Sequence, residues 1–366
     1  MKVGVLGTGG MGNGVIRRLQ ENERVEQVLA HDRDPQRLRQ TCEQRGVEGS
    51  LDLDELLRDP ALELVFVTAS NEGHYELTMR AIEAGKAVMC EKPIATTLSD
   101  ARRMVDAAEA SGCFLQIGFE LRYSKLYTRV QEWIDQGLLG KVVNTHCLYT
   151  VCEYWGSDSW RVLREPSGGM FGEKLSHYVD LPRWWIGDRV TQVHSVCAPN
   201  IIPYFEVHDN YHTTYRFANG AASHLTFMMG PAATFRGDPL QNVVDQQEGD
   251  GHVLRYRVVG TKGAAEASVF ERSIKRWAFD VAPKHFDAEL AEQVTWPAEE
   301  DHYYFHNTTD QAHDIVRRVA EGLPPKTSAR DAYETMKLSF AAEYSADAQE
   351  PVEVDELESS LLSSSR

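Results

Sequence analysis

The sequence predicts an α/β protein in which a doubly wound parallel sheet is followed by a second α/β domain with a large, mostly antiparallel sheet. Three observations predict this class. Residues 1–122 alternate short apolar strands with helical patterns, and residues 123–355 contain long strands of alternating polarity with few helices between them. The length of 366 residues also suits two domains better than one. We expect the Ser-rich segment 356–366 to be a frayed tail.

In the first domain, apolar runs and turn residues place strands and helices in alternation. The strands are expected at Lys2–Leu6, Val25–His31, Leu64–Thr68, Ala87–Cys90 and Phe114–Gly118. The helices are expected at Met11–Glu21, after the N-cap residue Asp34, at His74–Ala84 and at Ser99–Ala110. Because each strand is followed by a helix, we expect parallel strands with helices on both faces of the sheet.

In the second domain, a helix is expected at Tyr127–Gln136 and long strands follow it. The expected strands are Val142–Val151, Val190–Cys197, His212–Phe217, Ala221–Met229, His252–Gly260 and Ala264–Phe270. Asn219-Gly220 predicts a tight hairpin turn between two of them. Three further helices are expected at Gly172–Ile186, Asn307–Glu321 and Ala332–Ala346. The alternating polarity predicts a sheet with one covered face and one open face.

The charge of the chain limits its partners. The formal net charge is −17, so the surface repels nucleic acid and anionic lipid headgroups. No apolar run approaches the roughly 20 residues that a membrane span needs, and the first strand at Lys2 leaves no room for a signal peptide. The six scattered cysteines form no Cys-x-x-Cys pair, which favours reduced, mostly buried thiols. We therefore expect a cytoplasmic protein that binds neither nucleic acid nor a membrane.

A glycine-rich loop after the first strand predicts a dinucleotide site. In Gly7-Thr8-Gly9-Gly10-Met11-Gly12, the first glycine permits a tight turn, Gly9 lets the backbone approach a pyrophosphate, and Gly12 lets the helix pack against the strand. We expect the whole loop to contact the cofactor, with phosphates at the helix N-terminus. Asp32 ends the second strand, where its carboxylate can bind the adenosine ribose and repel a 2′-phosphate. These features predict a Rossmann domain that binds NAD, although Arg33 leaves NADP or dual use open.

A second motif, Glu91-Lys92-Pro93, directly follows a strand at its carboxyl end, where ligands bind in open parallel sheets. With its surroundings, this motif resembles the Gfo/Idh/MocA family, which is named for glucose–fructose oxidoreductase, inositol dehydrogenase and a rhizopine-catabolism protein. The similar segments are Ala69-Ser70-Asn71-Glu72-Gly73-His74, Gly118-Phe119-Glu120-Leu121-Arg122-Tyr123, Gly168-Gly169, His177-Tyr178-Val179-Asp180, Asp209-Asn210 and Phe217-Ala218-Asn219-Gly220. The resemblance covers nearly the whole chain.

The resemblance implies hydride transfer between a nicotinamide ring and a carbinol carbon of a sugar, a polyol or a related compound. It also implies homodimers or homotetramers that form through the open face of the antiparallel sheet. Further cofactor contacts are implied at Thr68, Ala69, Ser70, Asn71, His74, Glu91 and Lys92. The family's usual loop after the third strand is Thr-Pro-Asn. Ser70 stands here in place of the proline, so we expect a slightly different backbone path.

Lys92 and His177 are the first candidates for the chemistry. Oxidation of an alcohol needs a group on the hydroxyl that removes its proton as hydride leaves the carbon. Lys92 can hold the reacting oxygen, and the alternative is a surface lysine that caps a strand. His177 lies four residues after Glu173, on the same face of an expected helix. In the related inositol dehydrogenases Asp and His hold this spacing and His takes the proton, so we expect Glu173 to orient His177 or to contact a substrate hydroxyl.

Other side chains are expected near the substrate, each with a structural alternative. Asp180 shares the helix face of His177, but it could equally make an inter-element hydrogen bond. Arg122 and Tyr123 follow the last Rossmann strand, where the family often lines its substrate pocket. The family often places a Trp-Arg pair like Trp160-Arg161 near the cofactor, although a core tryptophan would explain Trp160 as well. Lys174 either reaches the site from the side or is solvated.

Two histidine pairs have a spacing of four residues, as zinc ligands often do. They are His208 with His212 and His302 with His306. The first pair runs into an expected strand and lacks a matching third ligand, and the second lies among aromatic residues before an expected helix, so we expect no metal. A role in the substrate pocket stays open for His306.

The joint motifs predict an NAD(P)-dependent dehydrogenase that oxidises a secondary hydroxyl of a small polyhydroxylated substrate: a sugar, an inositol or a glycoside. Two alternatives remain. One is redox-assisted glycoside cleavage, in which bound NAD is recycled. The other is a non-catalytic regulator that senses a dinucleotide, which the presence of Lys92 and His177 argues against.

Overall fold

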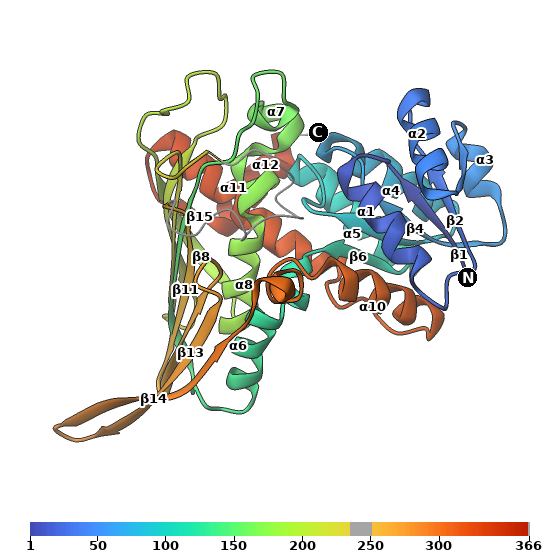
Figure 1. The fold of residues 1–366 in the computed structure, drawn as a ribbon. Coiled ribbons are helices and arrows are strands. Elements are labelled where there is room, and N and C mark those ends of the chain that lie inside the picture. The colour runs from blue at the N-terminus through green and yellow to red at the C-terminus, as the bar shows by residue number, and fades with distance from the viewer. Residues whose placement is uncertain (235–250, 365–366) are drawn as a thin grey trace.

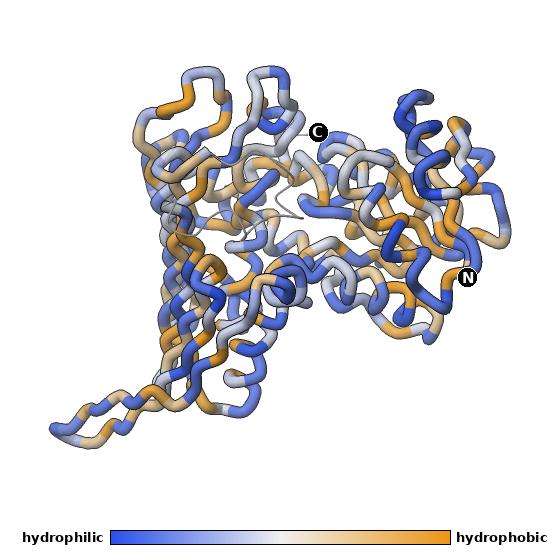
Figure 2. The backbone as a smooth tube through the Cα atoms, in the orientation of Figure 1, coloured by the Kyte–Doolittle hydropathy of each residue, from blue (hydrophilic) through white to orange (hydrophobic). Residues whose placement is uncertain are grey.

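The structure is a computed structural model that describes residues 1–234 and 251–364. Its body consists of the two sheet domains that the sequence predicts, placed side by side and joined by helices (Figure 1). Hydrophobic residues gather in the interior strands of both domains, and polar residues predominate on the outer helices (Figure 2). The predicted α/β class is confirmed.

The first domain is a parallel sheet with six strands among the described residues. Their spatial order is β3 (Glu48–Ser50), β2 (Gln27–His31), β1 (Lys2–Leu6), β4 (Leu62–Val67), β5 (Ala87–Glu91) and β6 (Leu115–Gly118). The helices of this domain are α1 (Gly10–Gln20), α2 (Pro35–Arg45), α3 (Leu53–Arg58), α4 (His74–Glu83) and α5 (Leu98–Ser111). The strand order reverses between β1 and β4, and such a switch point forms a crevice at the carboxyl ends of the strands.

The second domain is built on a sheet with nine strands among the described residues. Their order is β14 (His285–Thr295), β13 (Ser273–Ala282), β12 (Gly263–Ser268), β11 (Val253–Gly260), β7 (Val142–Val151), β10 (Ala222–Met229), β9 (Asn210–Phe217), β8 (Val190–Val196) and β15 (Val352–Glu353). Only the described pair β7–β10 is parallel. The turn between β9 and β10 has Gly220 at φ +87°, as Asn219-Gly220 predicts.

Helices cover one face of this large sheet. They include α6 (Lys125–Asp135), α8 (Ser176–Ile186) and α11 (Ala329–Ala348) (Figure 1). Trp133, Tyr127 and Trp185 are buried between α6, α8 and the strands, where Tyr127 and Trp185 also contact Tyr256 of β11. The opposite face carries polar residues such as His146 and His224. The association of copies of the chain through that open face stays a prediction.

Two C-terminal helices pack against the first domain, although they follow the second domain in sequence. Helix α10 (Thr308–Ala320) contributes Ile315 and Val316 to a core that it shares with Val3 and Val5 of β1. Helix α11 contacts α5, α8 and β8, so it lies between the two sheets. The chain therefore returns to its first domain after it has built the second one.

The structure corrects the expectation of a frayed tail. Helix α12 (Val354–Ser364) replaces it, with Leu357 buried in the core of the second domain. The Tyr333 hydroxyl donates to Glu358 at 2.7 Å, and Lys337 pairs with the same carboxylate at 3.0 Å. Tertiary contacts that a Ser-rich composition does not reveal therefore hold the helix in place. Residues 365–366 lie outside the described part of the chain.

The hairpin of β13 and β14 was missed by the sequence analysis. Its outer half projects beyond the body of the molecule, as Figure 1 shows. Both faces of this half are exposed to water, including Val281 and Phe286. A strand that is exposed on both faces has no reason to alternate apolar and polar residues, so the periodic pattern fails there.

No helix in the described ranges is long and apolar enough to cross a membrane. All six cysteines are free thiols, but only Cys90 and Cys147 are buried, and the other four are half-buried. The expectation of mostly buried thiols is therefore wrong.

Candidate active site

The glycine loop lies at the carboxyl end of β1, and two of its glycines are required by close contacts. A Cβ at Gly12 would lie 1.9 Å from the carbonyl oxygen of Gly7, and Gly7 itself has φ +100°. A Cβ at Gly7 would lie 2.6 Å from the Ala69 backbone, and Thr68 Oγ1 donates to the Gly7 carbonyl at 2.7 Å. Thr68 and Ala69 therefore hold the loop in shape.

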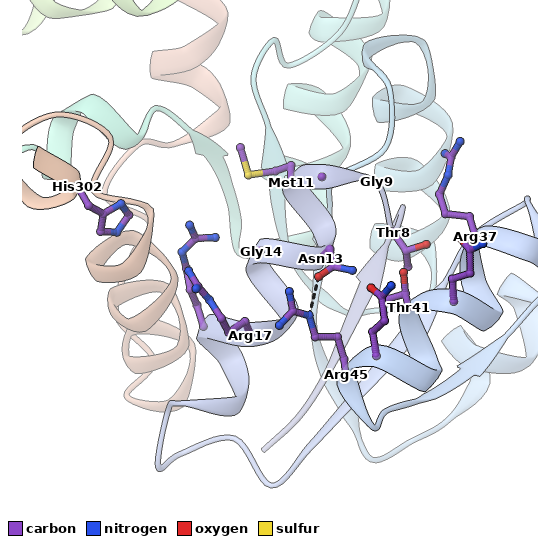
Figure 3. A pocket seen from close by; sticks show the side chains of 14 residues that line it. Thr8, Gly9, Met11, Asn13, Gly14, Arg17, Arg37, Thr41, Arg45 and His302 are labelled. Atoms are coloured by element: carbon purple, nitrogen blue, oxygen red, sulfur yellow. Dashed lines mark hydrogen bonds between the residues drawn. The ribbon is translucent and has the colours of Figure 1, made fainter. Parts of the chain in front are cut away.

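The space in front of helix α1 fits a dinucleotide. Nothing lies within 4 Å of a Cβ built at Gly9 or Gly10, and no side chain caps the helix at Gly9. The N–H groups of the first turn can therefore bind an anion. A groove of about 660 Å³ starts at Thr8 and Gly9 and continues between α1 and α2 (Figure 3). Its charged side chains are arginines, among them Arg17, Arg37 and Arg45, and this lining attracts phosphate groups.

Asp32 lies beside the loop as predicted, but its carboxylate is tied to the protein. It accepts hydrogen bonds from the Thr8 N–H at 2.8 Å, the Thr8 hydroxyl at 2.9 Å and the Asp34 N–H at 2.9 Å. Burial alone would raise the pKa of Asp32, but these hydrogen bonds hold it below its ordinary value. A negative charge therefore persists where a 2′-phosphate would lie. Arg33 extends into solvent, with its guanidinium 3.5 Å from Glu72.

The open space at Gly9 gives a test of this cofactor site. We expect Gly9→Ala to raise the Kd for NAD about tenfold or more, because the added methyl group occupies the space of the pyrophosphate. The free energy of unfolding should change by less than about 1 kcal/mol, since the methyl group meets no protein atom. Calorimetric titration with NAD and urea denaturation measure the two quantities. Wild-type affinity in this variant would place the cofactor elsewhere.

The loop after β4 serves mainly to hold neighbouring segments together. Ser70 has φ −63°, the angle that a proline ring would impose, so the expected difference in backbone path is not found at this angle. Asn71 is buried and donates to the Ser167 carbonyl at 2.8 Å and to Glu173 at 3.2 Å. The His74 ring bridges the carbonyls of Pro93 at 2.7 Å and Ala69 at 3.2 Å. The side chains of Asn71 and His74 are therefore already engaged by the protein.

Lys92 stands at the carboxyl end of β5, as the motif predicts. The Lys92–Pro93 peptide bond is cis, and the half-buried Lys92 ammonium donates to the carbonyl oxygen of Glu173. Glu91 instead points into the sheet, since a Cβ at Gly118 would lie 2.6 Å from its carboxylate oxygen. Burial, together with the negative charge of Glu120, raises the pKa of Glu91. The buried Glu91 side chain therefore supports this strand end, and its contact with the cofactor stays a prediction.

Glu173 and His177 do not form the predicted pair. The segment Phe171–Leu175 is a π-helix that precedes α8, and its i→i+5 hydrogen bonds displace Glu173 from the helix face of His177. Glu173 accepts from Arg161 Nε at 2.7 Å and from Asn71, and no hydrogen bond joins it to His177, both residues being in the described chain. The expectation that Glu173 orients the imidazole is therefore wrong.

The carboxylate beside His177 is Glu120, which the sequence analysis missed as a site residue. Nε2 of His177 lies 3.2 Å from Oε1 of Glu120, and Nδ1 of His306 lies 2.7 Å from the same oxygen. Glu120 and His177 are 3% and 4% exposed. Burial would raise the pKa of Glu120, but the two imidazoles hold it well below its ordinary value. The sequence signal that could have identified Glu120 as a site residue was its position directly after β6. Lys92 follows β5 at the same edge of the sheet, where the carboxyl ends of the strands lie.

The His177 ring has one nitrogen left for a ligand. Its Nδ1 atom is buried without a hydrogen-bond partner among the described residues. Burial and the positive charge of Lys92 lower the pKa of His177, although Glu120 opposes this shift. A neutral imidazole with a free, buried acceptor nitrogen is suited to take a proton.

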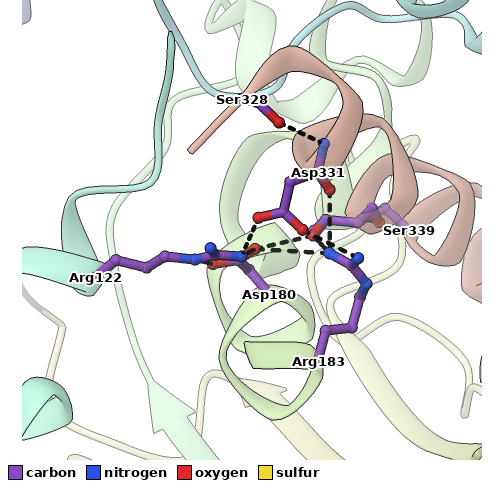
Figure 4. Close-up of polar contacts among 7 residues, drawn as sticks. Arg122, Asp180, Arg183, Ser328, Asp331 and Ser339 are labelled. Atoms are coloured by element: carbon purple, nitrogen blue, oxygen red, sulfur yellow. Dashed lines mark hydrogen bonds and ion pairs between the residues drawn. The ribbon is translucent and has the colours of Figure 1, made fainter. Parts of the chain in front are cut away.

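Arg122 and Asp180 form a network with α11. Two guanidinium nitrogens of Arg122 donate to the Asp180 carboxylate at 2.7 Å each, and Arg122 also pairs with Asp331 at 2.7 Å (Figure 4). Asp180 is 1% exposed and Arg122 is 7% exposed. Their charges are paired within the protein, as the structural alternative predicts. A role of either residue in substrate binding stays a prediction.

Tyr123 is also engaged by the protein. Its hydroxyl donates to Asp314 of α10 at 3.0 Å and accepts from Gln116 at 2.9 Å. Burial raises its pKa above the ordinary value. The Tyr123 hydroxyl therefore joins the first domain to α10, and a role of Tyr123 in the substrate pocket stays a prediction.

The predicted Trp-Arg pair reaches the site through Arg161. The guanidinium of Arg161 binds Glu173 and stacks 5.5 Å above the Trp160 ring. Lys174 points into the second domain, where its ammonium pairs with Glu153 and lies 5.2 Å above the Tyr149 ring. The solvated alternative for Lys174 is therefore wrong, since only 12% of its side chain is exposed.

The histidine pairs that resemble zinc ligands are separated by the fold. His208 binds Asp347, His302 binds Thr309, and His306 binds Glu120. His212 lies on the open face of the large sheet. Within residues 1–234 and 251–364, no group of three or more His, Cys, Asp and Glu side chains could hold a metal ion.

The chain matches two family models. Residues 1–119 match an oxidoreductase family with an NAD-binding Rossmann fold, and residues 127–266 match the GFO/IDH/MocA C-terminal domain. A myo-inositol 2-dehydrogenase of Thermotoga maritima is 25% identical over 98% of this chain and 99% of its own length. An uncharacterised oxidoreductase of Streptococcus pneumoniae is 32% identical, but this alignment spans 51% of the chain and only half of that relative.

Solved structures have the same fold along nearly the whole chain. A levoglucosan dehydrogenase in complex with NADH and levoglucosan has a TM-score of 0.78 at 20% identity, covering 97% of this chain and 99% of its own. A probable dehydrogenase from Thermotoga maritima has a TM-score of 0.76 at 23% identity, with coverages of 97% and 99%. At these identities the likeness concerns the fold.

Proposed function

Because this chain belongs to the Gfo/Idh/MocA family of NAD-binding oxidoreductases, we propose that it oxidises a secondary hydroxyl of a neutral sugar, inositol or glycoside with NAD. The proposal depends on one observation: the positive charge of Lys92 acts on the buried His177 ring, whose Nδ1 atom has no hydrogen-bond partner among the described residues, at the strand ends that also carry the glycine loop. The names of the relatives, an inositol dehydrogenase and a levoglucosan dehydrogenase, support the same substrate class.

The charges around the site favour a neutral substrate over a phosphorylated or carboxylated one. Arg161 is paired with Glu173, and Lys174 is paired with Glu153. Glu120 contacts two imidazole rings. Of the three cations Lys92, Arg161 and Lys174, Lys92 is therefore the one that is not paired with a carboxylate. An anionic group would need further cations of its own, whereas hydroxyl groups can use the hydrogen-bonding capacity of the paired side chains.

The proposed mechanism divides the work between these side chains. When bound, NAD supplies the hydride acceptor. The Lys92 ammonium, held by the Glu173 carbonyl, donates to the hydroxyl oxygen and stabilises the alkoxide as it forms. His177 is neutral because burial lowers its pKa, and its Nδ1 atom receives the hydroxyl proton. The ionised Glu120 then stabilises the resulting imidazolium through Nε2.

A substrate screen tests the proposal. We expect absorbance at the NADH wavelength to rise with at least one inositol, aldose, anhydrosugar or glycoside, and to rise more with NAD than with NADP because the Asp32 charge opposes a 2′-phosphate. Phosphorylated and carboxylated analogues of the active compound serve as matched controls and should react more slowly. Product release without accumulation of NADH would point to recycled cofactor and glycoside cleavage. No reaction with any compound, despite NAD binding, would contradict the proposed function.

A further inference from the structure

Two histidines share one oxygen of a buried carboxylate. Oε1 of Glu120 lies 2.7 Å from Nδ1 of His306 and 3.2 Å from Nε2 of His177. The two imidazole rings are 6.4 Å apart between centroids. The His306 side chain is 18% exposed and the His177 side chain is 5% exposed, so water reaches the first ring more readily than the second. One negative charge is therefore available to two bases, of which one faces solvent.

Charged and titratable groups from several elements surround this triad. Lys92 at the end of β5 acts on His177, and Glu91 of the same strand acts on Glu120. Glu153 after β7 and His302 of α9 (Asp301–Tyr304) both interact with His306. Burial raises the pKa of Glu91, and Glu153 is paired with Lys174. Of these three carboxyl groups, Glu120 is the one that contacts both imidazole rings.

We propose that His306 is a positioning residue that sets the proton affinity of His177 through Glu120. A proton on His306 engages the negative charge of Glu120, and the buried His177 then becomes a weaker base. Loss of that proton returns the full charge of Glu120 to His177. This inference rests on the proposed function for its effect on turnover, but the coupling between the two rings is a property of the protein alone.

The signs of the expected effects follow from the charges. Removing the negative charge of Glu120 leaves a buried imidazolium without a counter-charge, so protonation of His177 becomes harder. Removing the ability of His306 to become positive leaves Glu120 entirely to His177, so protonation of His177 becomes easier. Glutamine suits both positions because it keeps a polar side chain of similar length without an ionisable group.

Opposite shifts in the pH profile are therefore the test. For the holoenzyme with an active substrate, we expect the acid limb of kcat/KM to move up by about one pH unit in His306→Gln and down by about one pH unit in Glu120→Gln. The double variant should titrate close to Glu120→Gln, with only a small further shift from the loss of the direct charge of His306 on His177. His313→Gln is the matched control, since the His313 ring binds the Arg18 carbonyl at 3.0 Å instead of Glu120.

A second measurement needs no turnover. In NMR titrations of the histidine-labelled protein, the His177 signal, identified by its absence in His177→Asn, should titrate at higher pH in His306→Gln and at lower pH in Glu120→Gln. Unchanged titration of His177 in both variants, or shifts in the same direction, would overturn the coupling. If the coupling is present but no polyol is oxidised, the proposed function fails and the coupling stands.

Discussion

Replacing Lys92 with alanine is expected to lower kcat by about 10²- to 10⁴-fold, the usual contribution of a positioned acid or base. The physical reason is that the Lys92 ammonium projects from the end of β5, where the Glu173 carbonyl fixes its position. The variant should bind NAD with nearly wild-type affinity, because the glycine loop is held by Thr68 and Ala69. Initial rates of NADH formation and calorimetric titration with NAD give the two numbers.

Lys141→Ala is the matched control for this prediction. Lys141 is exposed directly before β7, and its ammonium lies 3.5 Å from the Asn219 carbonyl in the turn between β9 and β10. Its loss should leave turnover unchanged. Full turnover in Lys92→Ala with NAD bound would contradict the proposed mechanism. Loss of NAD binding in that variant would instead show that Lys92 acts mainly through the cofactor.

Replacing Asp180 with alanine is expected to destabilise the protein by about 3–5 kcal/mol. Burial alone would raise the pKa of the Asp180 carboxyl, but Arg122 holds it below its ordinary value, so the carboxylate is ionised in the folded protein. Its removal leaves the buried Arg122 guanidinium with Asp331 as its remaining carboxylate partner (Figure 4). The network joins the end of β6 to α8 and α11, so we expect a lower urea midpoint.

The double variant Arg122→Met/Asp180→Leu separates a structural role from a role in substrate binding. Removal of both buried charges avoids an unpaired ion, so this variant should be more stable than Asp180→Ala. Its KM for substrate should stay close to the wild-type value, since the two charges are paired with each other. A large rise in KM with little change in stability would show that Asp180 or Arg122 is a substrate ligand.

The alternation of strands and helices and the glycine spacing were sufficient to predict the Rossmann domain. Local rules determine these features: Asp34 caps α2 with hydrogen bonds to the N–H groups of Gln36 and Arg37, and Gly46 ends that helix with φ 66°. The strands β7 to β12 of the second domain were also predicted, from their alternating polarity. The pattern failed for the exposed end of the β13–β14 hairpin and for α12, because periodicity records burial and not the element itself.

The sequence by itself determined the cofactor loop, Asp32 and the position of Lys92, because a single strand end places each of them. Only the tertiary structure decided which carboxylate serves His177. A spacing of four residues selects Glu173 if the helix is α-helical, but the π-helix at Phe171–Leu175 changes the angular relation of the two side chains. Glu120 and His306 lie 186 residues apart and meet because α10, which follows His306, packs against the segment after β6. Contacts between distant segments depend on packing, which local spacing does not encode.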